Sequence, residues 1–221
     1  MEAAEETMTS WDGTKLFYRA WLPNGKKARK ALLLFHRGHE HSGRWQETVE
    51  ALGLDNVAVF AWDARGHGRS PGERGAAKDL TDVIKDVDAF VRHVSERSHI
   101  SIENMIVLAH SLAAVTVSAW VHDYAPPLRA LILATAAFEV RLYLPLAIPA
   151  LRLQQKVIGT GKVTSYVRAT MLTHDPVEAG RYESDPLIFK QIAINLLLDL
   201  HDTAGRLLAD AGPGGGAGLG R

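Results

Sequence analysis

The sequence predicts an α/β fold with a mostly parallel sheet, and three observations support this class. Short apolar runs alternate with helical patterns between residues 31 and 134, which is the order found in βαβ units. Four of the runs are continuously apolar, as in strands buried on both faces of a parallel sheet. The chain has 221 residues, 47% of them hydrophobic, which is enough to bury a core of this kind.

The N-terminal segment is predicted to form an antiparallel hairpin ahead of the parallel strands. Asp12 and Gly13 separate residues 7–11 from residues 16–21, and both segments alternate apolar with polar side chains. Asp-Gly is a favoured hairpin turn because it tolerates the positive φ angles that the turn requires.

The parallel strands and their helices follow in order. The four strands are expected at residues 31–35, 57–62, 105–109 and 131–134. A short helix carries Trp45, Val49 and Leu52 on one face, and a third helix is expected over residues 112–121. Between them lies a longer amphipathic helix whose apolar stripe consists of Leu80, Val83, Ile84, Val87, Phe90, Val91 and Val94.

Composition excludes several classes of function. The 25 Lys+Arg residues balance 25 Asp+Glu residues, which argues against a nucleic-acid partner. The absence of cysteine excludes disulfides, a thiolate nucleophile and cysteine-based zinc sites, and it favours an intracellular protein. The acidic start lacks the apolar segment of a signal peptide, and no apolar run has the length of a membrane span. We therefore expect a cytoplasmic protein, whose oligomeric state the sequence leaves open.

Three regions are predicted along the chain. Residues 1–140 form the core, residues 141–210 form a helical cap without strands, and the glycine-rich residues 211–221 form a disordered tail. The apolar cap segments 144–153 and 188–198 suit an acyl chain, or alternatively pack on the sheet. Such apolar segments are also compatible with peripheral contact of the cap with a membrane.

The literal G-x-S-x-G pattern of a serine nucleophile is predicted to be a decoy. It occurs at Gly68-Arg69-Ser70-Pro71-Gly72. The residue after the nucleophile must donate its backbone N–H to the oxyanion, and proline has no N–H. The next helical pattern also begins several residues later, so this serine does not open a helix.

The degenerate match at residues 109–113 is the better candidate for a nucleophile. Ser111 directly follows a predicted strand and opens a predicted helix, and Leu112 can supply the backbone N–H. The helix N-terminus would also favour a developing negative charge. The alternative is that Ser111 only caps the helix.

Three segments together resemble a known family. Residues 35–45 resemble the H-G-x-G-E-H-S-x-R-Y loop of monoacylglycerol lipases and lysophospholipases, the serine-aminopeptidase-like branch of the α/β hydrolases. Residues 63–70 are similar to the D-x-R-G-H-G-x-S loop of that branch, and residues 109–113 align with its nucleophile turn. Arg37 and Ala113 stand where glycine is usual. The resemblance implies an α/β-hydrolase fold, with Ser111 as nucleophile and the amides of Gly38 and Leu112 as oxyanion hole.

The remaining polar residues of these loops have two interpretations. His36, His39, His41 and Glu40 have the residue types and spacing of zinc ligands. The preferred interpretation is that they hold the shape of the loop, because a loop that leaves a buried strand presents them in different directions. Residues assigned to the same supporting role are Asp63, Arg65, His67 and His110. We expect no cofactor and no metal.

The sequence places no complete catalytic triad. A serine nucleophile needs a histidine base and a carboxylate that orients it. The histidines that follow Ser111 are His122, on the helix that Ser111 opens, and His174 and His201, both in the predicted cap. The resemblance implies further strands that carry the aspartate and the histidine. We therefore expect the last strands of the fold to be missing and residues 131–134 to form an exposed sheet edge.

The expected function is hydrolysis of a carboxylic ester of a lipid-like small molecule, a lysophospholipid or a monoacylglycerol, through an acyl-enzyme on Ser111. Two alternatives remain open. The chain is an inert fragment or binding module of the same family, or it is an acyltransferase or peptidase built on the same scaffold.

Overall fold

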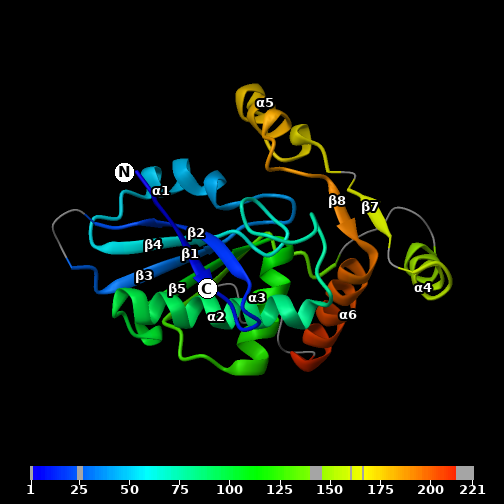
Figure 1. Cartoon of the computed structure of the whole chain (residues 1–221), viewed down its shortest axis with the longest axis horizontal. Helices are drawn as coiled ribbons and strands as arrows, with labels where there is room; N and C mark the ends of the chain where they lie inside the picture. The colour runs from blue at the N-terminus through cyan, green and yellow to red at the C-terminus, as the bar shows by residue number, and fades with distance from the viewer. Residues whose placement is uncertain (1, 24–26, 140–145, 160, 166, 213–221) are drawn as a thin grey trace.

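A computed structural model describes residues 2–23, 27–139, 146–159, 161–165 and 167–212. Its centre is a six-stranded sheet in the order β1-β2-β4-β3-β5-β6, in which β1, β2 and β4 pair antiparallel and β4, β3, β5 and β6 pair parallel (Figure 1). The strands are β1 (Ala4–Thr9), β2 (Lys15–Trp21), β3 (Lys30–Phe35), β4 (Val57–Trp62), β5 (Met105–His110) and β6 (Ala130–Ala134). The predicted α/β class, with its N-terminal hairpin and parallel strands, is confirmed.

The hairpin turns at the predicted Asp-Gly pair. The Asp12 carboxylate accepts a hydrogen bond from the backbone N–H of Thr14 at 3.0 Å, and the N–H of Ser10 donates to the carbonyl of Thr14 at 2.8 Å. Because residues 10–14 are taken up by this turn, β1 lies earlier in the chain than the predicted 7–11.

Helices cover both faces of the sheet. They are α1 (Gln46–Leu52), α2 (Leu80–Ser98), α3 (Leu112–Tyr124), α4 (Ala147–Val157), α5 (Pro176–Ser184) and α6 (Ile194–Asp210), with short 3₁₀ helices at Ser42–Trp45, Ile102–Asn104 and Ala169–Met171. Alternate residues of a strand face opposite sides, so Leu33 and Phe35 meet α2 and α3 while Leu32 and Leu34 belong to a smaller cluster with Val49 of α1.

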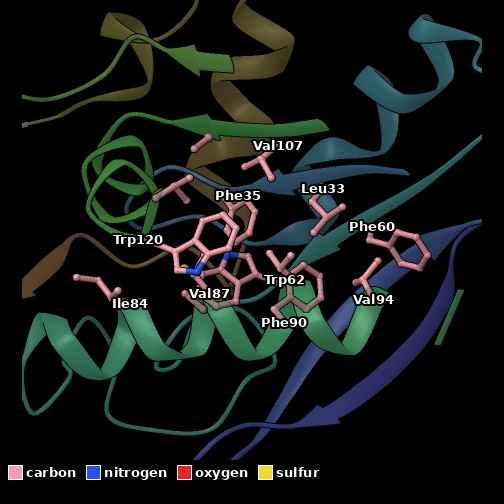
Figure 2. Close-up of a cluster of buried hydrophobic side chains, with 14 of the residues drawn as sticks. Leu33, Phe35, Phe60, Trp62, Ile84, Val87, Phe90, Val94, Val107 and Trp120 are labelled. Atoms are coloured by element: carbon pink, nitrogen blue, oxygen red, sulfur yellow. The ribbon is translucent and has the colours of Figure 1, made fainter. Parts of the chain in front are cut away.

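Aromatic rings form the centre of the larger cluster. The ring of Phe90, on α2, lies 5.9 Å from Phe35, 5.8 Å from Trp62 and 5.6 Å from Tyr18 between centroids. Figure 2 shows Phe90 and the other α2 side chains directed at the sheet, as the predicted apolar stripe requires. The helix begins at Asp79, whose carboxylate accepts a hydrogen bond from the N–H of Asp82 at 3.0 Å.

The region beyond β6 contains strands as well as helices, which corrects the prediction of a purely helical cap. β7 (Lys162–Thr164) and β8 (Gln191–Ala193) pair antiparallel in a separate two-stranded sheet. Three-residue strands are too short for a periodic pattern to reveal them. Figure 1 shows α4 and α5 projecting beyond the body of the molecule.

Helix α6 lies against the core and not on the projecting part. Its residues Leu196, Leu200 and Ala204 belong to the same buried cluster as α2 and α3. The carboxylate of Asp199 accepts a hydrogen bond from the N–H of Leu80 at the start of α2, at 3.2 Å. The predicted cap of residues 141–210 therefore includes a helix that packs against α2 and α3 of the core. Of the predicted tail, residues 213–221 lie outside the described residues.

Strand β6 forms an edge of the described sheet. It pairs with β5, and the side chain of Ile132 is 46% exposed. The exposed sheet edge predicted for residues 131–134 is confirmed, because no strand in the described ranges lies on the outer side of β6. The continuous apolar run alone had suggested burial on both faces. None of the helices described is long and apolar enough to cross a membrane.

The position of Phe90 predicts a large loss of stability on truncation. Phe90→Ala should lower the free energy of unfolding by about 3–5 kcal/mol, because it empties the space among three aromatic rings. Leu153→Ala, on the exposed surface of α4, should change it by less than about 0.5 kcal/mol. Urea denaturation followed by circular dichroism measures both values, and similar losses in the two variants would contradict the assigned core.

Candidate active site

Ser111 lies on a sharp turn between β5 and α3. Its backbone has φ 58° and ψ −118°, a conformation that residues with a Cβ rarely adopt. Backbone hydrogen bonds hold the turn: the N–H of Ser111 donates to the carbonyl of Ala134 at 3.0 Å, and its carbonyl accepts from Ala114 and Ala137. The Ser111 side chain makes no capping hydrogen bond to α3, so the helix-cap alternative does not describe it.

The loop after β3 lies directly against this turn. A Cβ built on Gly38 would come within 2.7 Å of Cδ1 of Leu112, so glycine allows the close approach. Gly38, Ser111 and Leu112 line one cavity of about 400 Å³. The structure thus brings together the three residues predicted for the nucleophile and the oxyanion hole.

The walls of this cavity come from both the core and the projecting region. Apolar side chains predominate on the side of β7, β8 and α6, namely Val163, Val167, Leu172, Ile192 and Leu197. A second, strongly apolar cavity adjoins it beneath α6 and shares Gly38, Leu112 and Ile192 with it. An apolar ligand group therefore has space on either side of Gly38.

Ser70, the serine of the literal G-x-S-x-G pattern, is held by two hydrogen bonds to the backbone. The Ser70 hydroxyl donates to the carbonyl of Asp63 at 2.6 Å and accepts from the backbone N–H of Phe17 at 2.9 Å. Its side chain is buried, and these partners join the loop after β4 to strand β2. Ser70 therefore braces the loop, in agreement with the sequence argument against it.

Asp63 is fully buried and joins two loops. Its Oδ1 accepts a hydrogen bond from the N–H of Ser42 at 2.6 Å, and its Oδ2 accepts one from the N–H of Arg69 at 2.7 Å. A Cβ at Gly68, whose φ is +48°, would lie 2.2 Å from this carboxylate, so only glycine fits there. The carboxylate holds the loop after β3 and the loop after β4 in one arrangement.

Two histidines of these loops are held neutral. His36 donates from Nδ1 to the carbonyl of Arg37 at 2.8 Å and accepts at Nε2 from the N–H of Ala64 at 3.1 Å, and burial lowers its pKa. His67 donates from Nδ1 to the carbonyl of Arg65 at 3.0 Å. Burial, and then the neighbouring His36, lower the pKa of His67 to about 3.

The other residues of the proposed metal set have separate partners. Glu40 accepts a hydrogen bond from Arg37 at 2.7 Å. His41 accepts at Nδ1 from the N–H of Gly43 and contacts Asp185 through Nε2 at 2.9 Å. His39 has a positive φ of 73°, and burial lowers its pKa to about 4. Across the described ranges, no cluster of three or more histidine and acidic side chains is arranged to hold a metal ion.

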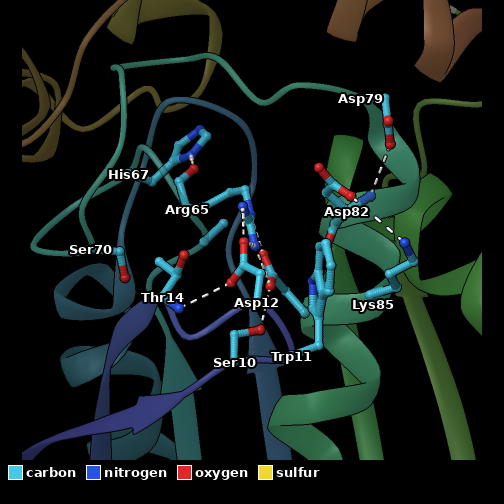
Figure 3. Close-up of polar contacts among 12 residues, drawn as sticks. Ser10, Trp11, Asp12, Thr14, Arg65, His67, Ser70, Asp79, Asp82 and Lys85 are labelled. Atoms are coloured by element: carbon cyan, nitrogen blue, oxygen red, sulfur yellow. Dashed lines mark hydrogen bonds and ion pairs between the residues drawn. The ribbon is translucent and has the colours of Figure 1, made fainter.

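Arg65 is part of a buried ion-pair network at the hairpin. Its guanidinium bonds both oxygens of Asp86, at 2.5 and 2.7 Å, and the carboxylate of Asp12 at 3.1 Å. Ser10 donates a further hydrogen bond to Asp86. Burial raises the pKa of Asp86, while the hydrogen bonds from Arg65 and Ser10 act in the opposite direction. Figure 3 shows Arg65 beside Asp12 and Ser10, so Arg65 joins the loop after β4 to the hairpin and to α2.

No histidine among the described residues forms a hydrogen bond with the Ser111 hydroxyl. His122 instead lies at the exposed end of α3, where it contacts Asp123 at 2.8 Å and Asp210 at 3.3 Å. His174 and His201 are exposed. His110 lines the Ser111 cavity and lies near the ring of Trp45.

Several residues that line the cavity were not predicted from the sequence. Tyr182 reaches it from the far end of α5, and Thr135 and Ala137 reach it from the turn after β6. Asp185, the residue after α5, contacts His41 of the loop that carries Gly38. Their positions depend on tertiary packing of segments that carry no motif.

A strained serine between a parallel strand and a helix, with a glycine loop packed against it, defines an α/β hydrolase. The sheet order and the two bracing loops are those expected for that class. The family comparison is more specific: the chain belongs to the serine aminopeptidase, S33 family, whose model matches residues 26–213.

Individual relatives agree with this family. The chain is 47% identical over 207 residues to the uncharacterized protein YnbC of Escherichia coli (strain K12), covering 94% of this chain and 35% of that protein. It is 28% identical to a monoacylglycerol lipase of Mycolicibacterium smegmatis, covering 84% of this chain and 65% of that enzyme. It is 33% identical to the monoglyceride lipase of Homo sapiens, covering 80% of this chain and 58% of that enzyme. The chain thus spans between about a third and two thirds of these relatives.

Solved structures show the same fold. The monoacylglycerol lipase of Paleococcus ferrophilus matches with a TM-score of 0.73 at 21% identity, covering 96% of this chain and 73% of that chain. A second match is a soluble variant of monoglyceride lipase from Saccharomyces cerevisiae in complex with a substrate analog. Its TM-score is 0.76 at 19% identity, covering 96% of this chain and 70% of that chain.

The strained backbone of Ser111 predicts that glycine at this position stabilises the fold. Ser111→Gly should raise the free energy of unfolding by about 1 kcal/mol, because glycine adopts this conformation without a Cβ clash. Ser111→Ala keeps the Cβ and is the matched control, for which no such rise is expected. Chemical denaturation measures both, and equal stability of the two variants would remove the evidence for strain.

The burial of His39 predicts a pH dependence of stability. Its folded pKa of about 4 lies below the usual value of 6.5, so the neutral ring stabilises the fold above pH 6.5 and this contribution is lost as the pH falls toward 4. The contribution falls by about 1.4 kcal/mol per pH unit in that window. His39→Asn, which tolerates the positive φ, should make the measured decline shallower by that amount. Parallel declines for the variant and the wild-type chain would contradict this prediction.

Proposed function

We propose that Ser111 is the nucleophile of a serine hydrolase that cleaves carboxylic esters of single-chain lipids, such as a monoacylglycerol or a lysophospholipid. The observation that carries this proposal is the strained Ser111 turn packed against Gly38 at the wall of a cavity rich in apolar side chains. Membership of the S33 family, and relatives named as monoacylglycerol lipases, support the reaction class and the substrate.

The proposed reaction is acyl transfer in two steps. The Ser111 Oγ attacks the ester carbonyl carbon, and the carbonyl oxygen becomes an anion that the amides of Gly38 and Leu112 would stabilise. The N-terminus of α3 adds a favourable field at the same point. The C–O bond to the alcohol breaks, the alcohol leaves with the proton taken from Ser111, and an acyl-enzyme remains. Water then attacks the acyl carbon, which releases the fatty acid and restores the serine.

The proton transfer needs a base that the described residues do not present to Ser111. Attack by serine depends on a histidine within hydrogen-bond reach, and no described histidine bonds the hydroxyl. This observation favours a second candidate function, a lipid-binding module that keeps the cavity without turnover. An acyltransferase or peptidase on the same scaffold differs in the acceptor or in the bond cleaved, and product analysis with ester, amide and alcohol substrates separates these reactions.

Location and membrane contact are further proposals. Helix α4 and the residue that follows it expose Leu153, Val157 and Ile158, and this supports peripheral contact of the cap with a membrane surface. A cytoplasmic location stays a prediction from the sequence.

The two candidate functions predict different covalent chemistry. A fluorophosphonate probe should add one phosphonyl group to the hydrolase at Ser111, which intact-mass spectrometry and peptide mapping detect. Ser111→Ala should abolish the adduct, and Ser165→Ala, which removes another hydroxyl from the same cavity, should leave it intact. The wild-type chain should also release fatty acid from a monoacylglycerol.

Two outcomes would overturn the hydrolase proposal. An adduct that persists in Ser111→Ala would assign the reactive group to another residue. Lipid binding without adduct or fatty-acid release would establish the binding module instead.

A further inference from the structure

The cavity that contains Ser111 also contains an arginine. We propose that this cavity takes a single-chain lipid ester with a phosphate-bearing headgroup, which Arg37 and Tyr182 bind through their free hydrogen-bond donors. This inference rests on the proposed function and makes its substrate class specific: a lysophospholipid in preference to a neutral monoacylglycerol.

The guanidinium of Arg37 has N–H donors that form no hydrogen bond within the described part of the chain. Its Nη2 bonds Glu40 at 2.7 Å, and its carbon lies 5.6 Å from the centroid of the Tyr182 ring. Its Nε is buried without a partner, and its Nη1 forms no hydrogen bond with any residue in the described part of the chain. The resembling loops have glycine at this position, so the cation distinguishes this chain from them.

Tyr182 supplies a second donor at the same wall. The residue is 3% exposed and lines the cavity, and within the described ranges its hydroxyl has no hydrogen-bond partner. The hydroxyl oxygen keeps accessible surface although the ring is buried, so a ligand oxygen in the cavity can accept its hydrogen bond in place of water. A phosphate offers several acceptor oxygens, and a guanidinium is well matched to them.

The cations around this wall are paired with carboxylates, and the donors that stay open in the described ranges belong to Arg37. Glu40 is shared, because Nε of Arg44 also lies 4.0 Å from its carboxylate. Nζ of Lys190 lies 5.8 Å from the centroid of the Tyr182 ring and pairs with Glu183, while Arg44 pairs with Glu178 at 3.4 Å. Glu139 lines the cavity too, but its side chain is exposed. Burial first and Arg37 second lower the pKa of His110, while Glu40 acts in the opposite direction.

Ether lipids test the headgroup separately from catalysis, because an ether bond is not cleaved by acyl transfer. The ligands are 1-O-octylglycerol 3-phosphate, 1-O-octylglycerol and glycerol 3-phosphate, each titrated calorimetrically into the chain below its micellar concentration. We expect the phosphate lipid to bind at least about tenfold more tightly than the neutral lipid, as a charge-assisted hydrogen bond implies. Glycerol 3-phosphate should bind more weakly than the phosphate lipid, because it lacks the chain that fills the apolar cavity.

Three variants assign the preference to the proposed donors. Arg37→Gln should bring the affinities for the phosphate and neutral lipids within about twofold of each other. Tyr182→Phe removes one oxygen and should reduce the preference severalfold, even if Arg37→Gln folds poorly. The matched control is Arg152→Gln, which removes a cation from the exposed face of α4, where Arg152 pairs with Asp202, and should keep the full preference.

Each contrary result has a defined meaning. Equal binding of the two lipids by the wild-type chain, or a preference that survives both Arg37→Gln and Tyr182→Phe, overturns the inference. Equal binding of glycerol 3-phosphate and the phosphate lipid assigns the site to free phosphate esters. Absence of binding by either lipid also overturns it. Whether the fluorophosphonate adduct forms at Ser111 tests the proposed hydrolase activity independently of these lipid affinities.

Discussion

The carboxylate of Asp63 determines how the two loops beside Ser111 lie. Each of its oxygens accepts a backbone N–H from a different loop, and its own backbone is bonded to strand β2. A buried carboxylate is stable only when its acceptor sites are filled, so the loops and the charge depend on each other. The loop that carries Gly38 reaches Leu112 from this fixed base. The position of Gly38 beside Ser111 therefore depends on the hydrogen bond between Asp63 and Ser42, at the other end of the same loop.

The strain at Ser111 is held by the structure around it. Its backbone bonds to Ala134 and Ala137 connect the turn to β6 and to the segment after it, while α3 continues directly from the turn. The large aromatic cluster beneath α2 and α3 keeps the strand and the helix in place. A local conformation that costs energy persists because many neighbouring contacts would have to be lost to relax it.

Most of the core was predictable from the sequence, because continuous apolar runs and a 3.6-residue stripe are strong local signals. The sharp turn at Ser111 was predictable for the same reason, since Ser111 lies between a strand signal and a helix signal. The strands β7 and β8 were missed because three residues carry no period. Asp86 was missed because a buried aspartate on an amphipathic helix looks like a surface residue until Arg65 is placed beside it. Tyr182 reaches the cavity and Asp185 reaches His41 through packing of α5, which no local pattern encodes.

The contact between His41 and Asp185 joins positions 144 apart in the sequence, one in the loop that carries Gly38 and the other at the end of α5. Thermodynamic linkage makes such a contact reciprocal. Whatever fixes the position of α5 also fixes the loop, and whatever orders the loop restrains α5. A substitution on the outer surface of α5 can therefore shift the loop that carries Gly38 without touching it, through the free energy shared by the two segments.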